Sequence, residues 1–354
     1  MPQPTVAILI VTYNNEKDIP HLMESLRHTD YSPEHVHVYI ADNNSHDSTI
    51  SLVHTFTHAF PFEYILIEHK ENFGFDVANN ELYQRAKNEK NSDYVVLLNP
   101  DTAVDPQWLK KLIVCMEQHK EVGAAQSLLL LKSDPEKINS AGNALFYGGI
   151  GYVSRMGEKS DTVYHQNISE IGYASGAAVC YRASVLSETG LFYPDFFYLE
   201  DADLSWRMRL LGYSIIMCPQ SVVWHNYSYS KGVYKMKAIE LNRHKALLQN
   251  YKIPTLIVLL PMLLLFEIMI IALSCVQGWG KEKLKNYKEL WSVRGCIIER
   301  RKHIRHTRKI KDRTVIRQMA LAIHFPEGDP LVLTYMVNPL FIVYGWIIRA
   351  CIWW

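Results

Sequence analysis

Residues 6–13 read VAILIVTY, and this stretch decides the fold class. Its first six residues are apolar and mostly β-branched, which is typical of a strand buried on both faces. Runs of the same kind recur along the chain and alternate with segments of helical spacing. The predicted strands are 6–13, 36–41, 64–68 and 94–99, and the predicted helices are 16–28, 47–58, 77–88 and 106–119. We therefore expect an α/β fold: a mainly parallel twisted sheet with helices on both faces and ligands at the carboxyl ends of its strands.

Beyond residue 131 the alternation stops. Residues 133–172 are rich in Gly, Asn and Tyr, and we expect irregular structure with short antiparallel pieces. A helix over 202–211 and a strand over 214–218 follow, and two apolar segments, 253–276 and 331–354, flank a basic stretch. We predict a catalytic domain over 1–226, a helical linker over 227–252 and a hydrophobic, basic membrane-associating region over 253–354.

The charge is distributed unevenly along the chain. Residues 1–230 hold 16 Lys and Arg against 28 Asp and Glu, a net charge of −12, whereas residues 231–354 hold 21 against 8, a net charge of +13. The negative charge of residues 1–230 is suited to binding metal ions and hydroxyl groups. A basic tail with so much apolar sequence indicates an anionic membrane surface and not nucleic acid. The six cysteines are scattered without a CxxC motif, and no basic leader precedes residue 6, so we expect reduced thiols and a cytoplasmic front domain.

Polar residues follow the first two predicted strands. Thr12, Tyr13 and Asn14 end the first strand, and Asp42 ends the second. A carboxylate at such a strand end can accept hydrogen bonds from a ribose hydroxyl or a base N–H. Asp and Asn are also ordinary turn residues, so Asp42 has a purely structural alternative.

The third and fourth strands are followed by groups suited to a diphosphate. Asn72 and Gly74 lie just before a helix, where a glycine allows close backbone approach and the helix N-terminus favours phosphate. Asn99-Pro100-Asp101 ends the fourth strand, and Asp101 is a hard oxygen ligand suited to Mg²⁺ or Mn²⁺. Its alternative role is to cap the following helix.

Three carboxylates, Glu200, Asp201 and Asp203, directly follow an apolar run. Such a group is compensated by a cation, a metal, a substrate hydroxyl or a helix N-terminus. Asp203 has the i,i+4 spacing to pair with Arg207, and either of the other two can serve as a general base. His225 follows the last predicted strand, where it is either a surface residue or a metal ligand.

The ordered combination of motifs resembles glycosyltransferase family 2, in its bacterial and archaeal rhamnosyltransferase-like branch, which has the GT-A fold. The matching text spans about residues 5–225 and comprises VAILIVTYNNEKDIPHLMESL, VYIADNNSHDST, ENFGFDVANN, YVVLLNPDT, FFYLEDADLSWRMRLLGY and VVWH.

The resemblance implies a role for each motif. Thr12, Asn14 and Asp42 would contact the nucleoside, and Tyr13, Asn72, Gly74 and Asn99 would complete the donor site. Asp101 would be the metal-binding acid, Asp201 the catalytic base and His225 a further metal ligand. The sequence departs from the family pattern at Asn99, which stands at the first acidic position of the metal motif.

We therefore expect an inverting glycosyltransferase that uses Mg²⁺ or Mn²⁺. Its donor would be a UDP-, dTDP- or GDP-sugar and its acceptor a hydroxyl of a glycan or a lipid-linked molecule, in cell-surface polysaccharide or glycoconjugate assembly. Two alternatives remain. A sugar nucleotidyltransferase would need a Gly-rich basic loop at the first turn, which reads TYNNEK instead. A non-catalytic nucleotide-sugar or glycan-binding protein would not need the acidic cluster.

The apolar tail has two possible relations to a membrane. Residues 253–276 are long enough to cross a hydrocarbon core of about 30 Å. A crossing would however place the 14 Lys and Arg of residues 281–317 opposite the catalytic domain, and Glu267 would lie near the bilayer centre. We expect in-plane or re-entrant helices on the cytoplasmic face, with Asn338-Pro339 interrupting the second segment. A buried helix or a dimer face is the soluble alternative.

Overall fold

The structure is a computed structural model that describes residues 3–58, 60–227, 233–325 and 328–354. The contacts between residues divide the chain into two compact units that interleave along the sequence. Unit 1 comprises Met1–Asn143, Val153–Asp195 and Ser214–Ser228, and unit 2 comprises Ala144–Tyr152, Phe196–Tyr213 and Tyr229–Trp354. The predicted functional domains stay a prediction, and residues 228–232 of the predicted linker lie outside the described part of the chain.

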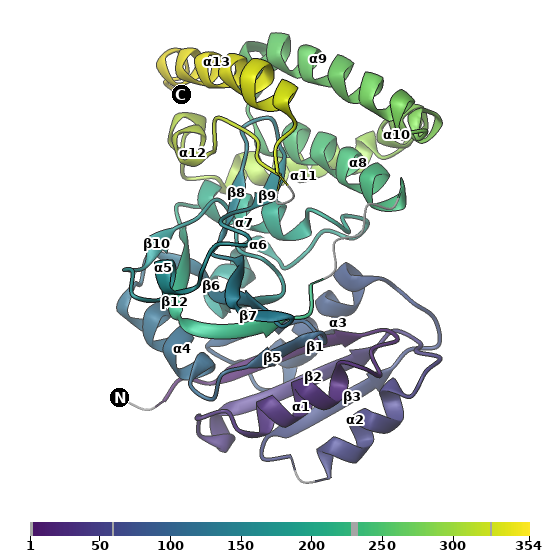
Figure 1. The fold of residues 1–354 in the computed structure, drawn as a ribbon, viewed down its shortest axis with the longest axis vertical. Helices are drawn as coiled ribbons and strands as arrows, with labels where there is room; N and C mark the ends of the chain where they lie inside the picture. Colours follow the sequence, from purple (N-terminus) through teal and green to yellow (C-terminus); the bar gives the residue numbers. More distant parts are fainter. Residues whose placement is uncertain (1–2, 59, 228–232, 326–327) are drawn as a thin grey trace. The chain divides into compact units, whose positions relative to one another are not determined.

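A ten-stranded sheet forms the centre of unit 1 (Figure 1). Its strand order is β10-β12-β6-β11-β4-β1-β2-β3, with β5 paired to β12 and β7 paired to β6. The strands are β1 (Val6–Thr12), β2 (Val36–Asp42), β3 (Glu63–Glu68), β4 (Tyr94–Leu98), β5 (Thr102–Val104), β6 (Val122–Leu131), β7 (Asp134–Ser140), β10 (Ser169–Glu170), β11 (Ala178–Arg182) and β12 (Ser214–His225).

The first four strands are parallel, as the sequence predicts. β1 pairs in parallel with β2 and β4, and β2 pairs in parallel with β3. In this register Thr12 lies opposite Asp42, and Asp42 lies opposite Glu68. The carboxyl ends of these strands therefore share one edge of the sheet, which confirms the expected placement of their terminal polar residues.

The remaining part of the sheet is more mixed than the sequence predicts. β11 is antiparallel to both of its neighbours, β4 and β6, while β12 is parallel to β6 but antiparallel to β5 and β10. Apolar runs such as AVCY in β11 are buried whatever their direction. Continuous hydrophobicity therefore indicates burial on both faces but does not indicate strand direction.

Helices cover both faces of the sheet. Alternate residues of β1, such as Ile8, share a hydrophobic cluster with Leu22 of α1 and Trp108 of α4. Ala7, on the other face, lies beside Tyr83 of α3. This alternation follows from the two-residue repeat of a strand. The helices of unit 1 are α1 (Ile19–Arg27), α2 (Thr49–Thr57), α3 (Phe75–Glu89), α4 (Trp108–Gln118), α5 (Asp161–Tyr164) and α6 (Ala183–Thr189), with a 3₁₀ turn η1 (Pro33–His35).

Unit 2 is mainly helical. Its helices are α7 (Glu200–Leu210), α8 (Val233–Asn250), α9 (Ile253–Val276), α10 (Gly280–Ser292), α11 (Arg294–Thr307), α12 (Asp312–Gln318) and α13 (Asn338–Cys351). A two-stranded hairpin, β8 (Asn143–Leu145) with β9 (Gly151–Val153), leads into and out of its first segment. A π-helical turn, η2 (Leu333–Val337), runs directly into α13, so Asn338-Pro339 does not interrupt the helix as predicted. The Asn338 side chain instead bonds both backbone groups of Ile323.

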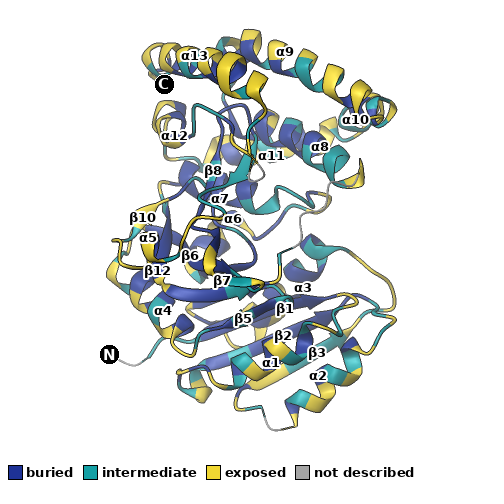
Figure 2. Ribbon diagram, viewed as in Figure 1, coloured by how far each residue is buried: buried dark blue, intermediate teal, exposed yellow. Residues whose placement is uncertain are grey.

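The two apolar helices α9 and α13 lie side by side (Figure 1). The rings of Phe266 and Phe341 are 5.8 Å apart, and the Trp354 indole donates to Thr255 Oγ1 at 2.8 Å. The outward residues of both helices remain exposed (Figure 2). They include Ile253, Ile257, Leu260, Leu264 and Ile268 of α9 and Leu340, Val343, Trp346 and Ile347 of α13. Within the described residues, two helical stretches are long and apolar enough to cross a membrane: α9, and Leu333–Cys351, which joins η2 to α13. Length and composition alone are weak evidence for a crossing.

Candidate active site

The ends of β1 and β2 are joined through Asp42. Its carboxylate accepts hydrogen bonds from Thr12 Oγ1 at 2.8 Å, from the Ser45 amide at 2.8 Å and from Ser45 Oγ at 2.6 Å. Only 1 % of Asp42 is exposed. The carboxylate thus holds the turn after β2 in place, which agrees with the structural role that the sequence offers as an alternative for Asp42. The contact of Asp42 with a nucleoside stays a prediction.

The loop after β1 presents Tyr13 and Asn14 at the same edge. Asn14 has a positive φ of 53° and is held on both sides: its amide donates to Ser45 Oγ, and its side chain accepts from the His46 amide, both at 2.9 Å. Tyr13 is 44 % exposed. An exposed aromatic ring beside a fixed polar loop is suited to packing against a nucleoside base.

The turn before α3 is built around Gly74. Its φ is +87°, and its amide donates to Asn72 Oδ1 at 2.9 Å. The carbonyl of Gly74 accepts from Asn43 Nδ2 at 3.1 Å, which ties this turn to the end of β2. The predicted site residues Asn72 and Gly74 therefore lie close to the residue that follows Asp42.

Sequence reasoning missed one residue that supports this turn. His69, at the end of β3, bonds Asn43 Oδ1 through Nδ1 and Glu81 through Nε2, both at 2.9 Å. Its side chain is 6 % exposed. The strand-end rule that singled out Asp42 also applies to His69, so this residue could have been found from its position after β3.

Asp101 and His225 come together although they are far apart in sequence. β5 pairs with β12 so that His225 lies opposite Thr102, and the Asn226 amide donates to the Asp101 carbonyl at 2.8 Å. His225 Nε2 is consequently 3.3 Å from Asp101 Oδ1. The other ring nitrogen, Nδ1, bonds Asn139 Oδ1 at 2.9 Å, a partner that sequence reasoning also missed.

This pair has the donor set of a divalent cation site. The side-chain oxygens Asn99 Oδ1 and Asp101 Oδ1 are buried acceptors without a hydrogen-bond donor. The bond from Nδ1 to Asn139 orients the imidazole and leaves Nε2 toward Asp101, the arrangement of a metal-binding histidine. A carboxylate oxygen and an imidazole nitrogen are ligands that suit Mn²⁺, and the carboxylate oxygen also suits Mg²⁺.

The acidic cluster begins α7, in unit 2. Glu200 and Asp201 are partly exposed, whereas Asp203 is 1 % exposed. Asp201 Oδ1 accepts from the Ala202 amide at 2.7 Å. The preceding Leu199 has a φ of 103°, a strained conformation of the kind found at functional sites.

Asp203 has a structural role. It accepts from Arg207 Nε at 2.8 Å, from Gln249 Nε2 at 2.6 Å and from Asn250 Nδ2 at 2.9 Å. The pairing with Arg207 agrees with the i,i+4 alternative raised by the sequence. Asp203 therefore joins α7 to the end of α8, and the partly exposed Glu200 and Asp201 are the members of the cluster open to a substrate.

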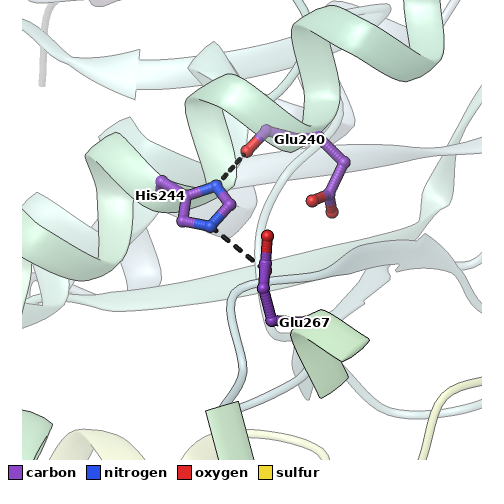
Figure 3. Close-up of side chains that lie close together, drawn as sticks. All are labelled: Glu240, His244 and Glu267. Carbon is purple, nitrogen blue, oxygen red and sulfur yellow. Dashed lines mark hydrogen bonds and ion pairs between the residues drawn. The ribbon is translucent and has the colours of Figure 1, made fainter. Parts of the chain in front are cut away.

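A second group of metal-type ligands lies in unit 2 (Figure 3). Glu240 and His244 share one face of α8, and Glu267 approaches them from α9, with ligand atoms within 4.8 Å of one another. His244 bonds the Glu240 carbonyl at 2.7 Å through Nδ1 and lies 3.2 Å from Glu267 through Nε2. Nothing in the spacing along the sequence indicates this group, because α8 and α9 must pack before it exists.

The positive charge that a metal would supply here is already present. Arg243 lies 2.8 Å from Glu240 and 2.6 Å from Glu267, and Lys283 contacts both carboxylates. Burial alone would raise the pKa of Glu240, but attraction to Arg243 and Lys283 outweighs it and lowers that pKa to about 2. The group is thus an ion-pair network that fastens α9 to α8 and α10.

Comparison with known proteins agrees with the fold and the motifs. The sequence profile of glycosyltransferase like family 2 matches residues 2–243. The poly-β-1,6-N-acetyl-D-glucosamine synthase of Staphylococcus epidermidis is 23 % identical over 219 residues, which are 62 % of this chain and 49 % of that protein. The N-acetylglucosaminyl-diphospho-decaprenol L-rhamnosyltransferase of Mycobacterium tuberculosis is 26 % identical over 245 residues, covering 64 % of this chain and 77 % of the relative.

Among solved structures, the mannosyltransferase PcManGT from Pyrobaculum calidifontis, in complex with GDP-Man and Mn²⁺, superposes with a TM-score of 0.51 at 15 % identity. The match covers 98 % of this chain and 87 % of PcManGT. At this identity the likeness shows the fold, which is GT-A. The chain spans about half the length of the staphylococcal synthase. Since the family profile covers more than half of the sequence, the chain belongs to the glycosyltransferase-like family 2.

Proposed function

We propose that the protein transfers a sugar from a nucleoside-diphosphate sugar to a hydroxyl of a glycan or lipid-linked acceptor, with inversion at the anomeric carbon. The observation that carries the proposal is the meeting of Asp101 and His225 in unit 1, whose sheet edge also holds Thr12 and Asp42. The family relatives support it, since two of them are named as a polysaccharide synthase and a rhamnosyltransferase.

The donor would bind along the carboxyl edge of β1, β2 and β3. Asp42, Thr12 and Asn14 would hold the nucleoside, and the backbone around Gly74 would approach the diphosphate. Asp101 and His225 would hold Mg²⁺ or Mn²⁺, and Asn99 would contact the donor. The bound cation would neutralise charge on the departing diphosphate. The Mn²⁺ and GDP-Man named for PcManGT support this assignment.

Asp201 would act as the general base. Its carboxylate would take the proton of the acceptor hydroxyl while that oxygen bonds to the anomeric carbon and the bond to the diphosphate oxygen breaks. The partial exposure of Asp201 at the start of α7 supports this role, since the base must reach a substrate oxygen. One displacement of this kind inverts the configuration and needs no covalent intermediate.

Release of nucleoside diphosphate tests the proposal. Full-length protein is incubated with UDP-, dTDP- and GDP-sugars, Mn²⁺ and a lipid extract as acceptor, and the wild-type rate is compared with that of Asp201→Asn. We expect release with one nucleotide class that depends on acceptor and on Asp201. A nucleotidyltransferase would instead release pyrophosphate from a nucleoside triphosphate, and a binding protein would release nothing with any donor.

We also propose that α9 and α13 lie in the cytoplasmic membrane interface and do not cross it. The exposed apolar stripe of α9 supports contact with lipid. Glu267, near the middle of α9, is bound to Arg243 of α8 and Lys283 of α10. A crossing helix would carry this charged network into hydrocarbon, at a high free-energy cost.

Cysteine labelling in intact cells tests this placement. The exposed Cys275, Cys296 and Cys351 are first replaced by serine, and single cysteines are then introduced at Ser292 or Lys120. We expect protection of both positions from a membrane-impermeant reagent. Labelling at 292 alone would demonstrate a crossing, and recovery of the protein in the soluble fraction at low salt would exclude membrane association.

A further inference from the structure

A cavity of about 390 Å³ lies within unit 2, at the junction of three helices. It is lined by the end of α8, the start of α9 and the second half of α11. Four of its lining side chains are cationic: Lys252, Arg301, Arg305 and Arg308. No carboxylate lines it among the residues that the structure describes.

The helical repeat brings Arg301 and Arg305 to one face of α11, because they are four residues apart. Arg308 follows directly after the last residue of the helix, with an extended backbone. Like charges at a spacing of four residues on a helix repel one another. Burial, together with the neighbouring Arg308 and Arg305, lowers the pKa of Arg301 and outweighs the opposing attraction of Asp312. Such a cluster creates a strong positive potential that attracts anions.

Most of this charge is not neutralised within the protein. Arg308 pairs with Asp312, whose carboxylate also accepts from the Lys252 amide at 2.8 Å and from Thr255 Oγ1. Arg301 donates to the backbone carbonyl of Leu248. Across the described part of the chain, no carboxylate lies within ion-pair distance of the side chains of Lys252, Arg301 or Arg305.

The cavity has an apolar wall beside its cationic side chains. Ile253, 55 % exposed, lines the cavity and begins the exposed apolar stripe of α9, which continues at Ile257. A ligand that fits this combination carries a phosphate next to a hydrocarbon chain.

We propose that this cavity binds the phosphate group of a lipid, with Lys252, Arg301 and Arg305 as its cationic contacts and the apolar stripe of α9 beside the lipid chain. A guanidinium group can bind two oxygens of one anion. A phosphate group offers more oxygens than a carboxylate, so it can bind both arginines at once, and this gives the site its preference for phosphate. The phosphate comes either from a bilayer phospholipid or from a lipid-phosphate acceptor. The inference does not depend on sugar transfer.

Vesicle flotation with the full-length protein tests the site. Phosphatidylcholine vesicles are doped with phosphatidylglycerol, with a polyprenyl monophosphate or with a fatty acid that gives the same negative charge. The test variant is Lys252→Gln/Arg305→Gln, since among the described residues neither side chain has a protein partner whose loss would unfold unit 2. The control Lys285→Gln/Lys302→Gln removes the same charge from exposed lysines that pair with Glu282 and Glu299.

We expect the test variant to bind phosphate-containing vesicles about tenfold or more weakly than the control variant, because the control loses only general surface attraction. The phosphate lipid that shows the larger difference identifies the source. Equal binding by the two variants, or an equal difference on fatty-acid vesicles, would overturn the inference. So would competition by inorganic phosphate at concentrations comparable to the lipid, which would indicate a free-anion site.

A separate measurement keeps this result apart from the proposed activity. The rise in melting temperature with nucleoside diphosphate and Mn²⁺ is recorded for the test variant and for Asp101→Ala. We expect the test variant to keep the rise and to lose lipid binding. Asp101→Ala should show the reverse. Loss of both properties in the test variant would mean that the substitutions disturb the whole fold and would contradict a local phosphate site.

Discussion

His225 Nε2 lies 3.3 Å from Asp101 Oδ1 because β12 runs antiparallel to β5 and brings His225 opposite Thr102. The contact therefore depends on the register of two strands that are distant in sequence. Asn139 bonds the far side of the imidazole at 2.9 Å and fixes the ring in this orientation. One carboxylate, one imidazole and one supporting amide thus form a connected group, and each member has a separate predicted effect.

Replacing Asp101 by Ala should abolish metal-dependent donor binding. Asp101 supplies the carboxylate of this group, so its loss would remove the negative charge that attracts the cation there. Asn139→Ala should weaken metal-dependent binding about 10- to 100-fold, because it frees the imidazole of His225 from its supporting bond. Calorimetric titration of nucleoside diphosphate with and without Mn²⁺ measures both effects. Equal affinity of the wild-type protein in the two conditions would remove the metal from the mechanism.

Substitutions of Asp201 and Asp203, two acidic residues of α7, should have different effects. Asp201→Asn should lower the turnover rate by about 10²-fold or more at unchanged melting temperature, since the amide keeps the bond to Ala202 but accepts no proton. Asp203→Asn should destabilise the protein by about 3–5 kcal/mol, because it removes the carboxylate from the buried ion pair with Arg207. Turnover and thermal unfolding of both variants check this. If Asp201→Asn retains its rate and Glu200→Gln loses it, the base is Glu200.

The sequence predicts the first half of the sheet well because its signals are local. Each of β1, β2 and β4 is a short apolar run that ends in polar residues, and the parallel order places Thr12, Asp42 and Asp101 at strand ends. The direction of a strand relative to its neighbours leaves a weaker signal in the sequence, so the sequence does not predict the antiparallel strand β11. Its residues are buried on both sides in either orientation.

The contacts that decide the role of each side chain are not local and could not be predicted. Asp203 is structural because Gln249 and Asn250 reach it from the end of α8. Asn139 supports His225 from a segment whose composition indicates only irregular structure. Glu267 is tolerated in an apolar helix because Arg243 faces it across the packing of α8 and α9. Each of these contacts forms only when helices or strands that are distant in sequence pack against each other.

Gly74→Ala should weaken donor binding as well as stability. At a φ of +87° a side chain strains the backbone by about 1–2 kcal/mol, and a Cβ would lie 3.2 Å from Asp76 Oδ1. The turn must then shift away from the position proposed for the diphosphate. Gly157→Ala is the control, since its φ is +81° and no atom lies within 4 Å. Urea unfolding should show destabilisation of both variants, whereas nucleoside diphosphate titration should show weaker binding by Gly74→Ala alone. Equal donor affinity in the two variants would contradict the placement.

Acid should destabilise unit 2 through Glu240. Burial opposes its ionisation, but Arg243 and Lys283 lower its pKa from the ordinary value of 4.5 to about 2. A carboxyl group with a lowered pKa in the folded state stabilises the protein above its unfolded pKa and loses that contribution as the pH falls toward the folded pKa. The shift corresponds to about 3 kcal/mol of stabilisation. This stabilisation is complete above about pH 5 and is lost progressively from there to about pH 2.

We expect Glu240→Gln to be less stable than wild type at pH 6 and to lose less stability on acidification. Glu282→Gln, which changes a surface residue paired with Lys285, should keep the wild-type dependence. Denaturant unfolding at pH 6, 4 and 3 measures the difference, and parallel curves for wild type and Glu240→Gln would show that the network does not stabilise the fold.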